Sequence, residues 1–175
     1  FAVGTIESKK AVSAEFKEAG NEVVFLPCPR DNAEVLDFAA LRKNLTEVHA
    51  AMEAGKINAA AAVKDGGIAA LVTTMCLGNE LGFGFIKPFN DTDSLFTLQT
   101  GGLVLELAKG VEPEEIFEGL DYMLLGHTTA NAGVAINDAV ISEAEAKHAY
   151  METLQGIFPY KLADVEAPAD IAQPL

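Results

Sequence analysis

The stretch that decides the fold is VKDGGIAALVTTMCLGNELGFGF, residues 63–85. A short alanine-rich run, residues 57–63, ends at its start, and a longer apolar segment follows a seam of two charged residues and two glycines. The seam consists of Lys64, Asp65, Gly66 and Gly67. A short apolar run is typical of a strand, whereas the second run has helical length and ends before Gly78. The sequence therefore predicts a strand, a glycine turn and a helix over Ile68 to Leu77.

Two interpretations of this turn remain open. The first N–H groups of a helix lack partners and carry partial positive charge, so an anion such as phosphate can bind there, and glycine allows close approach. Alternatively, Asp65 caps the helix and the glycines only form the turn. Neither a Walker-type phosphate loop nor a GxGxxG motif after a strand occurs in the sequence. A phosphate role for the turn is therefore a hypothesis.

The rest of the chain alternates between strand-like and helix-like segments. Further strands are expected at residues 2–6, 21–27, 82–89, 93–99, 101–108, 122–130 and 133–137, and further helices at 11–20, 37–55, 112–120 and 142–156. Asp37 suits the N-cap of the second of these helices, and Ser142 with Glu145 forms a capping box for the last one. The pattern predicts an α/β (α+β) domain, with helices flanking a mixed β-sheet.

The composition bears on which partners the chain can have. The chain has 175 residues and a net charge of −14, with 12 basic residues against 26 acidic ones. This balance argues against nucleic acid and anionic membranes as partners. No apolar run approaches the ~18 residues that span a bilayer. Cys28 and Cys76 lack metal-ligand spacing, which predicts reduced thiols in a cytoplasmic protein.

Few side chains suggest chemistry of their own. No histidine or cysteine pattern predicts a metal site, and no nucleophile motif predicts a catalytic residue. His127, at the end of an apolar strand, is the one histidine placed like a site residue, whereas His49 and His148 fall on helix faces. A hairpin turn explains the Gly101–Gly102 pair, but the neighbouring amide and hydroxyl side chains could also face a ligand. Those side chains, with the first glycine, are Gln99, Thr100 and Gly101.

The two ends of the sequence suggest a piece of a longer polypeptide. The chain opens without a methionine inside a strand-like segment, and it closes on ADVEAPADIAQPL, which has the composition of a linker. We expect a domain over residues 1–158 and, over 159–175, a linker toward a following domain.

Four segments, in order over about residues 2–137, resemble one superfamily. The segments are VGTIE…AVSAEFKEAGNEVVFL (3–26), GKINAAAAVKDGGIAALVTTMCLGNELGF (55–83), LFTLQTGGLVLEL (95–107) and YMLLGHTTA (122–130). Together they resemble the C-terminal domain of the aminoimidazole ribonucleotide (AIR) synthetase superfamily. Within it, MCLGNELGF (75–83) and AYMETLQGIFPYK (149–161) are most similar to the long, single-chain formylglycinamidine ribonucleotide synthases.

This resemblance implies a role inside a larger enzyme. Such synthases belong to purine biosynthesis and convert formylglycinamide ribonucleotide, glutamine and ATP into the amidine. The resemblance implies ATP and Mg²⁺ for the whole enzyme and no cofactor on this fragment alone. It also implies other domains of the same polypeptide as partners, an N-terminal AIR synthetase-like domain and a glutaminase domain. We expect the isolated fragment to be inactive.

The seam departs from the superfamily's pattern. In that pattern the strand end carries His-Asp, which helps to hold a nucleotide-bound Mg²⁺, and a serine follows that contacts the nucleotide. Here these positions are Ala61, Ala62 and Lys64, and the arginine of the next motif is Leu103. Methyl groups cannot bind a hard cation, which needs oxygen ligands. We hypothesise that this turn has lost the metal-binding function of the superfamily. The residues that remain to face a nucleotide or phosphate are Lys64, Asp65, Gly66, Gly67, Gln99, Thr100 and Gly101.

Two forms of this hypothesis differ in the role that they give to Lys64. Its ammonium group could replace the metal and pair with a phosphate directly. Alternatively, the domain is purely architectural. Rival interpretations of the whole chain are a domain of another ATP-dependent synthetase or kinase of the superfamily, and a free-standing, non-catalytic binding or assembly module.

Overall fold

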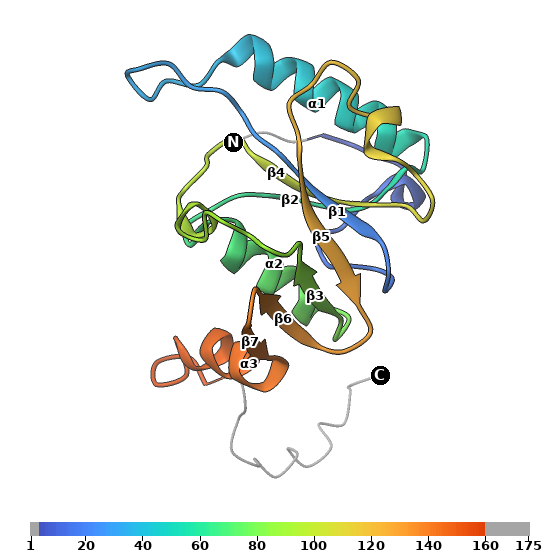
Figure 1. Ribbon diagram of the computed structural model, residues 1–175. Helices are drawn as coiled ribbons and strands as arrows, with labels where there is room; N and C mark the ends of the chain where they lie inside the picture. The colour runs from blue at the N-terminus through green and yellow to red at the C-terminus, as the bar shows by residue number, and fades with distance from the viewer. Residues whose placement is uncertain (1–3, 160–175) are drawn as a thin grey trace, which may run out of the picture.

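The computed structural model describes residues 4–159. Its elements in chain order are η1 (Ser8–Lys10), β1 (Glu22–Leu26), α1 (Phe38–Glu53), β2 (Ile57–Ala62), α2 (Gly67–Leu77), β3 (Gly82–Phe85), η2 (Asp93–Phe96), β4 (Leu103–Leu107), η3 (Pro113–Glu115), β5 (Met123–Thr129), β6 (Gly133–Ile136), β7 (Ala139–Ser142) and α3 (Glu143–Glu152) (Figure 1). The η elements are short 3₁₀ helices. The α/β (α+β) class expected from the sequence is confirmed.

One mixed sheet organises these elements. Its seven strands have the order β2-β4-β1-β5-β3-β6-β7. Only β3 and β6 run parallel, and every other neighbouring pair is antiparallel. Strands β2 and β7 therefore form the two edges of the sheet within the described part of the chain.

Helices α1 and α2 cover opposite faces of the sheet (Figure 1). Successive side chains of a strand point to opposite faces. In β1, Val24 and Leu26 pack in the apolar cluster that contains Val48 of α1. Val23 and Phe25 pack in the larger cluster, to which α2 contributes several side chains. The sheet is thus the middle layer of three, and α3 packs beside α2 against β6 and β7.

The local signals at helix ends are confirmed. Asp37 accepts hydrogen bonds from Ala39 N and Ala40 N, at 2.9 and 3.0 Å, and so caps α1. Ser142 and Glu145 form the expected capping box at the start of α3. Both motifs act through residues two or three positions away, which is why the sequence alone reveals them.

Three expected elements are wrong. Residues 11–20 form no helix, because Phe16 N donates instead to Met75 O and the next two N–H groups donate to a carboxylate of β4. Residues 93–99 form no strand, since η2 occupies their first half. The stretch 112–120 contains only η3 and a turn at Gly119, whose φ is +71°.

Further differences from the expected elements lie at the edges of the sheet and at the ends of the chain. Strand β7 was not expected, although it pairs antiparallel with β6. Strand β2, which the sequence predicts, lies at the other edge, and Ala62 at its end is exposed. Of the strand expected at residues 2–6, residues 4–6 are not in a strand and residues 2–3 lie outside the described part. The expected linker at 159–175 also lies outside it, apart from Pro159.

Candidate functional site

The seam between β2 and α2 is a glycine turn, as expected. Gly66 is the N-cap of α2 with φ +87°, and Gly67 follows with φ +69°, so both adopt a conformation that disfavours other residues. Asp65 does not cap the helix, because the N-cap position is occupied by Gly66, which has no side chain to accept a bond. Gly67 also packs against η2, where a Cβ would lie 2.4 Å from Leu95 O. The two glycines are therefore required by the fold itself.

The second predicted segment lies directly beside this turn. Val63 N donates to Gly102 O at 2.9 Å, and Ala62 pairs with Leu103 in the β2–β4 ladder. Gly102 N donates to Gln99 O at 2.9 Å, which closes a turn rather than the expected hairpin between two strands. The structure thus brings the backbone of residues 63–67 and that of residues 99–102 together.

The Gln99 side chain and the backbone of the second turn have partners of their own. The Gln99 amide donates to Ser94 O at 3.4 Å, and Thr100 O accepts a hydrogen bond from the Arg30 guanidinium at 3.2 Å. Gly101 has φ +85° and packs against Cys28, where a Cβ would lie 3.0 Å from the cysteine Cβ. This turn is therefore tied to the loop after β1.

Mostly apolar side chains line the described surroundings of the positions at which the superfamily's pattern places the metal. Ala61, Ala62 and Leu103 line a groove of about 320 Å³ between α1 and β2, together with apolar side chains and His49. No group of three or more His, Cys, Asp or Glu side chains within residues 4–159 is arranged to hold a metal ion. Lys64 is exposed, and no ion pair found within the described residues involves its side chain.

Of the three histidines, His49 lines the groove beside Ala61 and Ala62, and the other two lie elsewhere. His127 lies within β5 with its side chain half exposed, and its Nε2 is 3.6 Å from a carboxylate oxygen of Glu22 on the neighbouring strand. His148 lies 3.8 Å from Glu152 on the surface of α3. Both cysteines are free thiols, and burial raises the pKa of Cys76 to about 12.

A buried polar cluster that sequence reasoning missed lies at the other end of β4. Glu106 is fully buried, and its carboxylate accepts hydrogen bonds from Lys17 N at 2.8 Å, Glu18 N at 3.2 Å and Asn21 Nδ2 at 2.7 Å. The Thr128 hydroxyl donates to Glu18 O at 2.6 Å and accepts from Asn21 N at 2.9 Å. A glutamate inside the apolar run LVLEL was the available signal. The cluster anchors residues 17–21 to the sheet.

Comparison with known proteins defines the class of fold. No family model matches the sequence, and no curated protein matches it. Among solved structures, phosphoribosylformylglycinamidine synthase II from Thermotoga maritima has a TM-score of 0.64 at 13% identity, covering 95% of this chain and 31% of that one. The chain has an AIR synthetase-like fold, as the sequence resemblance implied.

Other solved structures agree with this fold. T. maritima PurL complexed with ATP gives a TM-score of 0.62 at 13% identity, covering 95% of this chain and 30% of that chain. HypE from E. coli, a hydrogenase maturation protein, gives a TM-score of 0.53 at 18% identity, covering 71% of this chain and 48% of that chain. The present chain spans less than a third of the length of the T. maritima enzyme. No helix among residues 4–159 is long and apolar enough to cross a membrane.

Proposed function

We propose that this chain is a domain of a phosphoribosylformylglycinamidine synthase, a cytoplasmic ATP-dependent ligase of purine biosynthesis. The enzyme would use glutamine to convert formylglycinamide ribonucleotide into the amidine. The observation that carries the proposal is the fold likeness to the T. maritima synthase over 95% of this chain. The four ordered sequence segments support the same assignment independently. Residues 1–158 would form the domain and 159–175 a linker toward the glutaminase domain, with an N-terminal AIR synthetase-like domain as the other partner.

Within that enzyme the chain would act as a scaffold and as a wall that faces phosphate, not as a catalytic unit. ATP and Mg²⁺ are expected for the whole enzyme. The seam does not fit a magnesium site, because Ala61 and Ala62 offer only methyl groups and Asp65 is a single exposed carboxylate. We therefore derive no step through a metal on this chain.

The phosphate-facing residues would be those of the two adjacent turns, with Lys64 as the charged group. Lys64 is exposed, and no ion pair within residues 4–159 involves its side chain. The first turn of α2 follows it along the chain; Gly67 N there donates to Lys64 O at 3.0 Å, and no side chain within the described residues caps this helix end. A charge-assisted hydrogen bond contributes about 1.5–3 kcal/mol. Lys64→Ala in the full-length enzyme should therefore weaken nucleotide binding by about 10- to 100-fold. Lys109→Ala, at another exposed lysine, is the matched control.

The Lys64 test separates the two roles of the domain. Nucleotide content that stays unchanged in Lys64→Ala would rule out the phosphate contact and leave the domain as a scaffold. A loss seen equally in Lys109→Ala would indicate a general effect of charge on the enzyme.

The function itself is tested with the full-length polypeptide. Glutamate and ADP should form only when ATP, glutamine and formylglycinamide ribonucleotide are all present, and the isolated chain should form neither. ATP use that needs no glutamine would instead favour another synthetase or kinase with this fold. A native polypeptide of only 18.5 kDa, measured by immunoblotting of source extract, would favour a free-standing binding module.

A further inference from the structure

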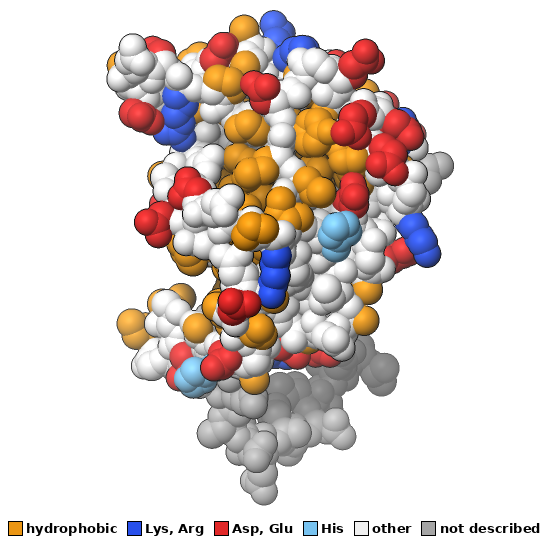
Figure 2. All heavy atoms as spheres, in the orientation of Figure 1, with side chains coloured by type: hydrophobic (Ala, Val, Ile, Leu, Met, Phe, Trp, Pro, Cys, Tyr) orange, Lys and Arg blue, Asp and Glu red, His pale blue; other side chains and the backbone are white. Residues whose placement is uncertain are grey.

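An apolar groove lies on the outer side of α2, between this helix and α3. It has a volume of about 650 Å³, and its walls include small residues of α2 and of α3. Those residues are Ala69, Ala70, Thr73, Ala146 and Ala149. Figure 2 shows the hollow on the left of the molecule, between the main body and the lobe formed by α3. We call it the α2–α3 groove.

Large apolar side chains of the groove remain exposed. Val140 is 71% exposed, Tyr150 62% and Phe96 59%, and all three line the groove. Helix α3 buries none of its own residues within the described part of the chain. Contiguous exposed apolar surface of this kind marks an interaction site in a folded protein. The groove therefore exposes apolar surface that no element within residues 4–159 covers.

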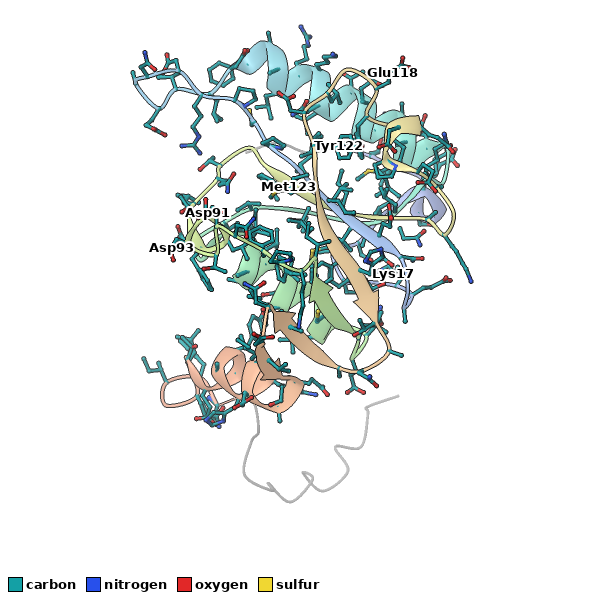
Figure 3. All side chains as sticks on the ribbon, viewed as in Figure 1. Lys17, Asp91, Asp93, Glu118, Tyr122 and Met123 are labelled. Atoms are coloured by element: carbon teal, nitrogen blue, oxygen red, sulfur yellow. The ribbon has the colours of Figure 1, made fainter. Side chains whose placement is uncertain are left out.

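Glu145 lines the groove, and three further acidic residues lie in or next to chain segments that contribute to its lining. We call Asp65, Asp91, Asp93 and Glu145 the acidic rim. Asp65 precedes the groove residue Gly66. Asp93 is the first residue of η2, the element that carries Phe96, and Asp91 lies two positions before it (Figure 3).

Few basic side chains offset this rim. Lys147, on α3, lies within 3.7 Å of carboxylates of both Glu80 and Glu143. Lys64 is the basic residue nearest in sequence to the groove residue Gly66. The rim therefore leaves an excess of negative charge around an apolar floor. The net charge of −14 on the whole chain also disfavours a second copy as the occupant.

We propose that the α2–α3 groove binds an amphipathic α-helix of another domain or chain, with an apolar face flanked by lysine or arginine. Two helices walled by small residues leave room for a third helix to approach at about 8–10 Å between axes. The apolar face of that helix would cover Phe96, Val140 and Tyr150, and its basic flank would face the acidic rim. The inference goes beyond the proposed function and does not depend on it.

The test is a titration of this chain into a fluorescein-labelled helical peptide, followed by anisotropy. The peptide has about 16 residues, with leucine at positions i, i+3, i+4 and i+7 and lysine beside them. A dissociation constant on the order of 10 μM is expected. A peptide of the same composition with its leucines scrambled should bind at least about tenfold more weakly, as should one with glutamate in place of lysine.

Variants then locate the bound peptide. Ala149→Arg places bulk and positive charge in the groove and should weaken binding by about tenfold or more. Ala50→Arg is the matched control, since Ala50 is an exposed alanine of α1, outside the groove. Tyr150→Ala, a truncation at an exposed position, provides a second variant should the arginine disturb α3.

Each outcome decides the proposal. Weaker binding in Ala149→Arg and Tyr150→Ala, with Ala50→Arg unchanged, supports it. Equal binding by the groove variants and the control would place the peptide elsewhere and overturn it. Failure of the lysine peptide to bind, or equal binding by the glutamate peptide, would also overturn it.

Discussion

Glu106 joins the segment before β1 to β4, the second strand of the sheet, and its removal should destabilise the domain. The side chain is 0% exposed and accepts three hydrogen bonds, two from backbone N–H groups of Lys17 and Glu18 and one from the Asn21 amide. Glu106→Ala removes the acceptor and leaves all three donors without a partner. Figure 3 shows Lys17, the first of these donors, near the lower end of β5.

The expected magnitude follows from these three donors. Each buried donor left unpaired costs about 1–3 kcal/mol, so the sum is about 3–9 kcal/mol if nothing relaxes. The two backbone donors are only partly buried, so water can hydrogen-bond to them in the variant. The free energy of unfolding is therefore expected to fall by about 3–5 kcal/mol. Glu106→Gln keeps one acceptor atom but turns the other into a donor that faces an N–H group. Its expected loss is about 1–3 kcal/mol.

Urea unfolding followed by far-ultraviolet circular dichroism measures this loss, since the chain has no tryptophan. Glu118→Ala is the matched control. This glutamate is exposed and lies far from the cluster (Figure 3), so the free energy of unfolding should change by less than about 0.5 kcal/mol. A Glu106→Ala protein within about 1 kcal/mol of wild type, with the same urea slope, would refute the anchoring role.

Three further predictions concern the turn, a partly exposed carboxylate and the thiols. Gly67→Ala should lower the free energy of unfolding by about 2–4 kcal/mol, because Gly67 has a positive φ and the new Cβ would lie 2.4 Å from a carbonyl oxygen of η2. Gly84→Ala is the control: a Cβ at Gly84 meets open space, so this change should not lower the melting temperature. A hydrogen bond from Lys17 lowers the pKa of Glu15 from 4.5 to about 2. The ionised Glu15 carboxylate therefore stabilises the folded chain above pH 4.5, and this contribution is lost as the pH falls toward 2. Glu15→Gln should therefore flatten the stability profile between these values, and an unchanged profile would contradict this. Because burial raises the pKa of Cys76 to about 12, a thiol reagent at pH 8 should modify only Cys28 in the native chain, and both thiols after unfolding.

The candidate site could be predicted only in part. The turn at residues 64–67 follows from its glycines and from the change of period on either side. The turn at residues 99–102 was expected as a hairpin, yet its hydrogen bond to Val63 belongs to a ladder between strands far apart in sequence. No local pattern of Gln99 or Thr100 predicts that neighbour. The acidic rim and the α2–α3 groove likewise join segments that the sequence keeps apart.

The sequence by itself determined the features that depend on neighbouring residues. These are the cap at Asp37, the capping box at Ser142, the glycine turn before α2 and the apolar strands of a mixed α/β sheet. Each depends on contacts within a few positions or on a period of the chain, so the sequence records it directly.

Only the tertiary structure decided the fate of residues 11–20, which have a helical pattern and form no helix. The backbone N–H groups of Lys17 and Glu18 donate to Glu106, almost 90 positions along the chain. A helix has to bond its own N–H groups, whereas a buried carboxylate requires donors from wherever the fold can supply them. Because the second requirement concerns a group distant in sequence, local propensity could not reveal it.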